Sequence, residues 1–474
     1  MDIYASHSTI PGKPHHRDAS YNYAQYSAEF GLFEQAFEAA GMPAGSIQGA
    51  TYAGSKWYGE IGDYIKTHGS KLKTVSYHKY ARSSCSGHLV TQADLLSYVA
   101  GEGSFSDAWK ESAATIATAN ISFVIGEGNS ISCGGTSGVS DTFPSALWVL
   151  DFLPWASKSG AAAMNFHGGP HGPYAAVSFA GSTAAPVMNP MYYGLLAFSE
   201  LVGNYSRWLP LNITGGGGNA GGGGAGGAGI SYSGAGAGAG AGISRSAGRR
   251  DGMPTPTTTM VQDANDAAAD PQCLHGIKSG LVCCAASCGI CGGTTCAHEP
   301  GGPESCCGTH IERNNMSCTL NPAPCIIDET WGPKVISHAT IDAHGAVKVL
   351  IVTKDLHATG ATPVTVCLEQ QQQQPPQPQR PNAGTEAAAL ADTATVAFLS
   401  APKGASSKAG DGITWAGQTF DNTPDGTPQG TRSVTTIARN PPAAGASGQV
   451  CFDVTMPALS AAMLHVAPAP AHRT

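Results

Sequence analysis

The first 208 residues repeat a pattern in which a short apolar segment alternates with an amphipathic one. Apolar segments typical of strands cover residues 46–54, 72–80, 121–128 and 161–169. Segments with helical spacing, often with Ser, Asp or Pro near the start and Gly near the end, cover residues 27–42, 55–69, 91–100, 140–160 and 191–203. Strands that alternate with helices pair in parallel, so the pattern predicts a parallel α/β architecture for residues 1–208.

The second half of the chain has a different pattern. Residues 209–214 and 333–474 contain short alternating segments with His-Gly and Asp-Gly turns, which predict an antiparallel β-domain. Within it, residues 369–384 are rich in Gln and Pro, which predicts a disordered loop. Residues 215–272 are rich in Gly and contain few core-forming side chains, so we expect a flexible linker there.

Charge and hydropathy exclude several partners. The formal net charge is -8, which argues against a nucleic-acid partner. No run of eighteen or more apolar residues occurs, so we expect no membrane span. Residues 1–212 contain no nucleotide-binding loop, Ser–His–Asp arrangement or metal signature, and we expect neither a cofactor nor a metal.

Ten of the fourteen cysteines form a dense module at residues 273–325. A CxxC pair, Cys288 and Cys291, is compatible with zinc, but the even count, the Cys-Cys pairs and the Gly-rich spacing favour disulfides. The disulfide candidates of the module are Cys273, Cys283, Cys284, Cys288, Cys291, Cys296, Cys306, Cys307, Cys318 and Cys325. Outside it, Cys367 and Cys451 flank strands of the β-domain and are a further candidate pair, and Cys85 and Cys133 follow adjacent strand ends.

The cysteines predict an oxidising compartment, extracellular or in the secretory pathway. Asn204, Asn212 and Asn315 begin N-glycosylation acceptor sequences, which agrees with that compartment. The first residues lack a basic segment followed by an apolar one, so we expect the signal peptide to lie upstream of Met1.

Polar and aromatic side chains stand at the ends of the four predicted strands. Tyr52 ends the first strand, and Asn165 and His167 end the fourth. His78 and Tyr80 end the second, and Glu127 follows the third on a glycine-flanked turn. Alone, Glu127 fits either a solvated turn residue or a catalytic acid. Because the carboxyl ends of parallel strands meet on one face, the Tyr and His side chains favour a site there.

The stretches "GEGNSISCGGTSGVSDTFPSALWVLDFL", "AAAMNFHGGPHGPY" and "NPMYYGLLAFSELVG" resemble the heparanase-like enzymes of glycoside hydrolase family 79. These include β-glucuronidases that act on glucuronic-acid-containing glycans. The resemblance covers residues 1 to about 212, and the closing β-domain is also similar. It implies the last four β–α units of a (β/α)8 barrel followed by a β-sandwich.

The resemblance also implies roles for individual residues. Glu127 matches the nucleophile of a retaining mechanism, and Tyr80 matches a tyrosine that orients this carboxylate. His78 matches a histidine that lines the sugar subsite, and Tyr174 lies near a tyrosine that helps to bind the uronic-acid carboxylate.

A retaining glycosidase also needs a general acid/base, a second carboxyl group roughly 5 to 5.5 Å from the first. The opening residues "MDIY" resemble those that follow this glutamate in the family, so we expect it to lie upstream of Met1. The sequence therefore predicts a chain that is inactive by itself. The alternative is a secreted, non-catalytic scaffold that carries the cysteine module and binds glycans or cell-wall polymers.

Overall fold

The computed structural model describes residues 21–169, 172–179, 185–203, 206–210, 212–214, 228–232, 334–369, 389–441 and 449–469. All of them belong to one unit, formed by Met1–Tyr232 and Gly332–Thr474. The cysteine module at 273–325, Asn204, Asn315 and most of the Gln/Pro loop lie outside the described residues.

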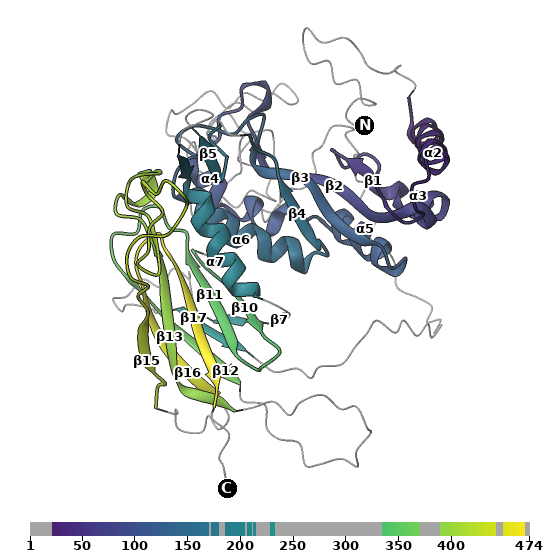
Figure 1. Ribbon diagram of the computed structural model, residues 1–474. Coiled ribbons are helices and arrows are strands. Elements are labelled where there is room, and N and C mark those ends of the chain that lie inside the picture. Colours follow the sequence, from purple (N-terminus) through teal and green to yellow (C-terminus); the bar gives the residue numbers. More distant parts are fainter. Residues whose placement is uncertain are drawn as a thin grey trace, which may run out of the picture. The chain divides into compact units, whose positions relative to one another are not determined.

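A four-stranded parallel sheet forms the first part of the structure (Figure 1). Its strands, in spatial order, are β1 (Ile47–Tyr52), β2 (Leu72–Ser83), β3 (Ser122–Ser132) and β4 (Ala163–Phe166). Every neighbouring pair runs in parallel, as the alternating pattern predicts. The strands β2 and β3 continue several residues beyond the predicted segments 72–80 and 121–128, so His78, Tyr80 and Glu127 lie inside the strands and not at their ends.

Helices precede, connect and follow these strands. The α-helices are α2 (Tyr23–Ala39), α3 (Ile61–His68), α4 (Gln92–Leu96), α5 (Asp107–Thr118), α6 (Pro144–Lys158) and α7 (Pro190–Val202). Short 3₁₀ turns cover Tyr58–Glu60, Gly69–Lys71, Cys85–Gly87, Tyr98–Ala100, Glu102–Ser104 and Gly404–Ser406. The helix α5 was not predicted from the sequence. Ser106 caps it, since its side chain accepts a hydrogen bond from the Trp109 backbone N–H at 3.3 Å.

One face of the parallel sheet is aromatic and buried. The Tyr77 ring of β2 stacks on Tyr52 of β1, with ring centroids 5.3 Å apart. Trp109 of α5 covers the same face and meets Tyr77 and Phe123 edge-on or tilted, at 5.7 and 4.9 Å. Side chains alternate along a strand, so the neighbours of Tyr77 in β2, Ser76 and His78, belong to the opposite face. The apolar face therefore anchors the sheet, and the other face is left for polar residues.

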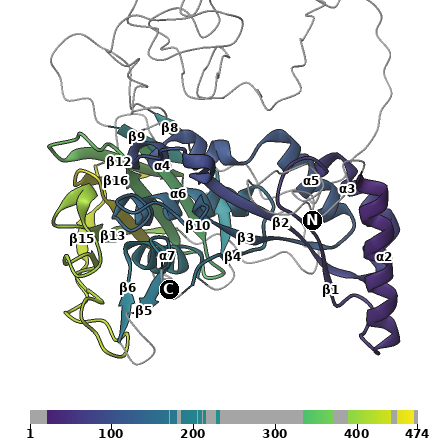
Figure 2. The same ribbon diagram turned by 90° about the horizontal axis from the view of Figure 1, so that it is seen from above.

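The helix α2 lies at the β1 edge of the sheet (Figure 2). A capping box starts it: the Asn22 side chain accepts from the Gln25 N–H, and the Gln25 side chain accepts from the Asn22 N–H. Tyr26 ties the helix to the sheet, because its hydroxyl donates to the Ala50 carbonyl at 2.8 Å.

The remainder of the described chain consists mainly of β-sheet. The larger, seven-stranded sheet has the order β14-β13-β17-β11-β10-β7, with β15 also paired to β13. Its strands are β7 (Arg207–Leu209), β10 (Val335–Ile341), β11 (Val347–Thr353), β13 (Leu390–Ser400), β14 (Thr414–Trp415), β15 (Thr435–Ala438) and β17 (Ala461–Pro468). The smaller sheet has the order β16-β12-β9-β8, with β8 (Asn212–Thr214), β9 (Ala228–Tyr232), β12 (Thr362–Glu369) and β16 (Gln449–Met456). A separate hairpin joins β5 (Val177–Phe179) and β6 (Pro186–Met188).

The two larger β-sheets share a core. Ile351 and Leu464 of the seven-stranded sheet belong to the same buried cluster as Val366 and Phe452 of the sheet β16-β12-β9-β8. One strand differs from the sequence-based expectation: Ala228–Tyr232 falls in the segment expected to be a flexible linker, yet it forms β9, which pairs in parallel with β12. The segment joins the sheet through its backbone hydrogen bonds to β12, and its Gly-rich composition did not indicate a strand.

Polar contacts join the helices α6 and α7 to the seven-stranded sheet. Asp151 of α6 pairs with Lys354, just after β11, at 2.8 Å. Glu200 of α7 accepts from the Trp415 indole at 2.9 Å and pairs with the Arg432 guanidinium at 2.8 Å. The α/β and β parts of the described chain are thus held together by several charged side chains.

Two disulfides link described segments. Cys367 and Cys451 face one another on β12 and β16, with Cα atoms 4.0 Å apart. Cys85 and Cys133 connect the segments after β2 and β3, with Cα atoms 5.3 Å apart. These are the two pairs that the strand-end positions suggested. No helix among the described residues is long and apolar enough to cross a membrane.

Candidate active site

A β-bulge in β3 determines where Glu127 lies. Tyr77 of β2 pairs with Ile125 of β3, but the next pair is His78 with Glu127, so Gly126 is an extra residue in β3. The register with β4 shifts over the same residues. Without the bulge, Glu127 would share the buried aromatic face with Ile125, because residues two apart lie on the same side of a strand. The bulge instead brings Glu127 to the face of His78.

Both glycines beside Glu127 are required by the close approach of β2. A Cβ atom on Gly126 would lie 2.9 Å from the Ser76 Cβ. A Cβ atom on Gly128 would lie 2.1 Å from the Lys79 backbone oxygen. The sequence predicts that Glu127 lies on a glycine-flanked turn after the strand. The structure corrects this: Glu127 lies inside β3, and the glycines permit the bulge and the close packing of the strands.

Tyr80 and His167 hold one oxygen of the Glu127 carboxylate. The Tyr80 hydroxyl donates to Glu127 Oε1 at 2.8 Å. His167 Nδ1 lies 2.6 Å from the Tyr80 hydroxyl oxygen and 3.4 Å from Glu127 Oε1. Since the Tyr80 proton goes to the carboxylate, the hydroxyl oxygen accepts from an Nδ1–H of His167. The two residues form a short chain of hydrogen bonds that ends at the carboxylate.

The other expected residues surround this chain. His78 Nδ1 lies 3.7 Å from Glu127 Oε2, the carboxylate oxygen that Tyr80 does not contact. The Tyr174 hydroxyl lies 3.2 Å from His167 Nδ1. Asn165 contributes less directly, because its side chain donates to the Gly126 carbonyl at 3.3 Å. The structure therefore brings all five expected neighbours of Glu127 to one place.

Asn129 supports the site and was not predicted to do so. It is fully buried, and its side-chain N–H₂ donates to the backbone oxygens of His167 and Tyr174 at 2.7 and 3.1 Å. It thereby fixes the backbone of these two residues. The position of Asn129, two residues after Glu127 in "GEGN", could have indicated a place near the site. Its two backbone acceptors, however, could not be read from the sequence.

The electrostatics of the site keep the tyrosines protonated. Burial, together with the hydrogen bond to Glu127 and the charge of that carboxylate, raises the pKa of Tyr80 well above its usual range. Burial and the Glu127 charge raise the pKa of Tyr174 in the same way. Both phenols therefore remain hydrogen-bond donors at any physiological pH.

Glu127 is open to solvent, with 37% of its side chain exposed, which leaves room for a ligand. Within the described ranges, it is the carboxylate that contacts the Tyr and His side chains of the site. The same ranges contain no group of three His, Cys, Asp or Glu side chains placed to hold a metal ion. The arrangement suits an anionic nucleophile that is oriented by a phenol and surrounded by hydrogen-bond donors.

Comparison with known proteins gives one family match. Residues 338–463 match the family model described as the glycosyl hydrolase family 79 C-terminal beta domain. A comparison with curated protein sequences gave no match.

Solved structures extend the likeness to the parallel sheet. A 4-O-α-L-rhamnosyl-β-D-glucuronidase from Fusarium oxysporum 12S is 16% identical with a TM-score of 0.52, covering 93% of this chain and 64% of that enzyme. The GH51 arabinofuranosidase from Xanthomonas axonopodis pv. citri is 11% identical with a TM-score of 0.43, covering 94% of this chain and 63% of that one. The chain thus spans less than two thirds of the length of either protein.

A parallel α/β sheet followed by a sheet-rich region is the fold that this chain shares with the glucuronidase structure. Residues 338–463 match the C-terminal β-domain of glycoside hydrolase family 79, which supports the resemblance to that family seen in the sequence.

Proposed function

We propose that this chain supplies the nucleophile of a retaining glycoside hydrolase of the β-glucuronidase type, which acts on glucuronic-acid-containing glycans. The observation that carries this proposal is the 2.8 Å hydrogen bond from the Tyr80 hydroxyl to Glu127 Oε1 on the polar face of the parallel sheet. A carboxylate that is oriented in this way, exposed and bordered by histidines is suited to attack an anomeric carbon.

In fold terms, we propose that the four β–α units are the last half of a (β/α)8 barrel and that the two β-sheets form a β-sandwich. The division into an aromatic face under α5 and a polar face around Glu127 supports the barrel, whose interior carries the site at its strand ends. The core shared by the two β-sheets supports the sandwich.

The geometry suggests a different role for each oxygen of the Glu127 carboxylate. Oε1 already accepts from Tyr80, so Oε2 is the oxygen that attacks. The bond from the anomeric carbon to the aglycone oxygen breaks as the bond to Oε2 forms, and water later hydrolyses this glycosyl ester. His78, His167 and Tyr174 supply donors for an anionic sugar. This set supports a uronic acid as the substrate class, and the similar glucuronidase from Fusarium was solved as a Rha-GlcA complex.

The leaving aglycone needs a proton from a second carboxyl group, the general acid/base. No second carboxylate contacts Tyr80, His167 or Tyr174 within the part of the chain that the structure describes. We therefore propose that the 474-residue chain does not turn over glucuronides with poor leaving groups.

An activated substrate tests the nucleophile without the need for a general acid. In 2-deoxy-2-fluoro-β-D-glucuronyl fluoride, the fluoride departs without protonation, and the 2-fluoro group slows hydrolysis of the ester. The full chain should form one covalent adduct, which peptide mass spectrometry should locate on Glu127, and should leave an alkyl glucuronide intact. The corresponding glucosyl fluoride, which lacks the carboxylate, should react at least about 10-fold more slowly, the effect of losing one charged contact.

Glu127→Gln is the control, because it preserves the shape of the side chain and should form no adduct. An adduct elsewhere, or none with a folded protein, would contradict the assignment of the nucleophile. Turnover of the alkyl glucuronide that disappears in Glu127→Gln would contradict the proposed inactivity and leave the nucleophile in place.

A non-catalytic glycan-binding scaffold is the second candidate, and the openness of the Glu127 site is what favours it. It predicts binding of a glucuronic-acid-containing oligosaccharide that Glu127→Gln does not weaken, with no adduct from the fluoride. In either case we propose an extracellular or secretory location, which the two disulfides support.

A further inference from the structure

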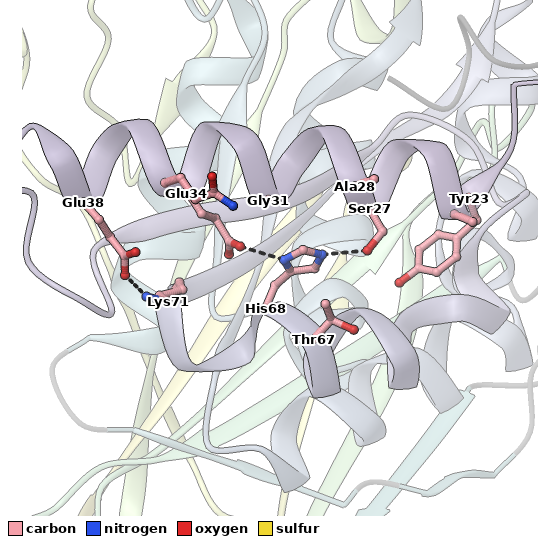
Figure 3. Close-up of a pocket in the computed structure, with 11 residues that line it drawn as sticks. Tyr23, Ser27, Ala28, Gly31, Glu34, Glu38, Thr67, His68 and Lys71 are labelled. Atoms are coloured by element: carbon pink, nitrogen blue, oxygen red, sulfur yellow. Dashed lines mark hydrogen bonds and ion pairs between the residues drawn. The ribbon is translucent and has the colours of Figure 1, made fainter.

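A second group of chemically reactive side chains lies away from Glu127, in a cleft between α2 and the end of α3 (Figure 3). The cleft has a volume of about 630 Å³. Small residues of α2, namely Ala24, Ala28 and Gly31, leave this space open. Ser27 and Glu34 are seven residues apart on α2, so both belong to the same face of the helix.

His68 connects these two residues. Its Nε2 lies 2.8 Å from the Ser27 hydroxyl oxygen, and its Nδ1 lies 2.8 Å from Glu34 Oε2. Both contacts are satisfied at once when Nδ1–H donates to the carboxylate and the Ser27 hydroxyl donates to Nε2. In that tautomer, His68 is positioned to take the serine proton, as in a serine–histidine–carboxylate triad.

The burial of His68 and Glu34 distinguishes these two contacts from ordinary hydrogen bonds on a protein surface. His68 is 2% exposed and Glu34 is 8% exposed, whereas Ser27 is only half-buried and borders the cleft. The ring of Phe30 meets the imidazole edge-on at 5.0 Å and excludes water from it. Glu34 Oε1 is buried and has no hydrogen-bond partner among the described residues. An unsatisfied buried carboxylate oxygen beside an open cleft is costly to maintain for packing alone.

Two features can stabilise the charges of an acyl-transfer reaction. His68 lies in the last turn of α3, where the helix dipole favours the positive charge that the imidazole gains. The Tyr23 ring lies beside Ser27 at the same end of the cleft (Figure 3). The Tyr23 hydroxyl is buried, and burial raises its pKa to about 12, so it remains a proton donor for a developing oxyanion.

We propose that Ser27, His68 and Glu34 form a second catalytic centre, which hydrolyses esters of short acyl groups. Ser27 Oγ bonds to the ester carbonyl carbon while its proton moves to His68 Nε2. The bond to the alcohol oxygen then breaks, and the alcohol leaves with that proton. Water, deprotonated by Nε2, then attacks the acyl-serine carbonyl; the bond to Ser27 Oγ breaks, Oγ takes the proton back from Nε2, and the carboxylic acid leaves. Glu34 acts as a positioning residue, because it touches His68 and not the substrate.

The sequence did not reveal this centre because His68 is 41 residues from Ser27, and only the packing of α2 on α3 brings them together. The Ser27 centre shares no residue with the Glu127 site, so its labelling should not depend on Glu127. The full chain is treated with a fluorophosphonate probe, in which Ser27 Oγ displaces fluoride. Peptide mass spectrometry should find the label on Ser27, and Glu127→Gln should be labelled equally well.

Matched variants test the mechanism with p-nitrophenyl acetate. Ser27→Ala should lower kcat/KM at least about 100-fold and abolish labelling, while Ser199→Ala, at an exposed helical serine, should change neither. Glu34→Gln should lower kcat and leave KM within about twofold, because it alters only the orientation of His68.

Ser27→Cys supplies a measurement that does not depend on ester turnover. A cysteine that gives its proton to His68 should be alkylated by iodoacetamide at pH 7 at least about 10-fold faster than the cysteine of Ser199→Cys. Adding His68→Gln should remove this difference. If a folded chain is not labelled at Ser27 and Ser27→Cys reacts no faster than Ser199→Cys, the proposal is wrong.

Discussion

The Tyr80 hydroxyl is the contact on which the reactivity of Glu127 should depend most. It donates to the carboxylate at 2.8 Å, and a hydrogen bond to a charged group contributes roughly 1.5 to 3 kcal/mol. Tyr80→Phe removes this bond and leaves the ring in place. We expect the rate of adduct formation with the glucuronyl fluoride to fall about 10- to 100-fold, as measured by intact-protein mass spectrometry over time.

Tyr98→Phe is the matched control, since Tyr98 lies in a 3₁₀ turn after α4 and contacts none of the site residues in the described chain. Its adduct should form at the wild-type rate. Equal rates for Tyr80→Phe and wild type would mean that other groups orient Glu127.

At the level of single residues, much of the candidate site was predictable. His78, Tyr80 and His167 could be placed beside Glu127 because the carboxyl ends of parallel strands converge. Asn129 could not, because its two acceptors are backbone oxygens of a distant loop. The extra residue Gly126 was also hidden, since a bulge is defined by the partner strand and not by the bulged one.

Among the elements, the pairing of β2 with β3 tolerates the least change. Gly128 has no room for a Cβ atom, because the Lys79 backbone oxygen would lie 2.1 Å from it. Gly128→Ala must therefore move one strand away from the other. We expect a loss of about 1 to 3 kcal/mol in the free energy of unfolding, measured in urea, and a disturbed Glu127 position.

Gly62→Ala is the corresponding control, because Gly62 is inside α3 and nothing lies within 4 Å of a Cβ there. Replacing a helical glycine in open space should stabilise the protein by up to about 1 kcal/mol. If both variants were equally stable, the close approach of β2 and β3 would not restrict residue 128.

The strands of the parallel sheet could be predicted from the sequence, whereas helix α5 and the start of helix α6 could not. Strands β1 to β4 were predictable from apolar segments bounded by turns. The helix α5 was overlooked because "DAWKESAATIAT" has few large apolar residues, and its burial depends mainly on Trp109. Helix α6 was expected to begin at Ser140 and Asp141, but it begins at Pro144. Asp141 instead accepts from the Gly138 N–H and pairs with Lys408 of the β-region, a partner that its local sequence does not reveal.

At the scale of the whole molecule, the α/β part and the β-region share a cluster of charges in which Asp151, His338 and Lys354 are buried and Lys158 is exposed. His338 of β10 is 1% exposed, and Lys158 of α6 donates to its Nδ1 at 3.0 Å. Asp151 of α6 lies 3.9 Å from the other ring nitrogen, and Lys354 pairs with Asp151 at 2.8 Å. Burial opposes the charge on Asp151, but Lys354 and His338 hold the pKa of that carboxyl below its ordinary value.

This cluster should make stability depend on pH through His338. Burial, and the Lys158 and Lys354 charges, lower the pKa of His338 to about 4, although Asp151 partly opposes them. The unfolded chain, with an ordinary histidine pKa of about 6.5, binds a proton more readily than the folded one. The stabilisation is therefore complete above pH 6.5 and is lost as the pH falls towards 4, by about 3 kcal/mol in all.

Urea unfolding of wild type and His338→Gln between pH 7.5 and about 4.5 measures this effect, because Gln preserves an acceptor for Lys158 but does not titrate. Carboxylates remote from His338 are common to both proteins and cancel in the difference between the two, and Asp151 keeps Lys354, its largest favourable charge partner, in both. We expect wild type to lose about 2 kcal/mol more than His338→Gln over this range. His344→Gln, at an exposed histidine after β10, should follow wild type at every pH. If the free energy of unfolding changed with pH in the same way for wild type and His338→Gln, His338 would be protonated equally in the folded and unfolded chains. That result would contradict the prediction made from its burial and its two Lys neighbours.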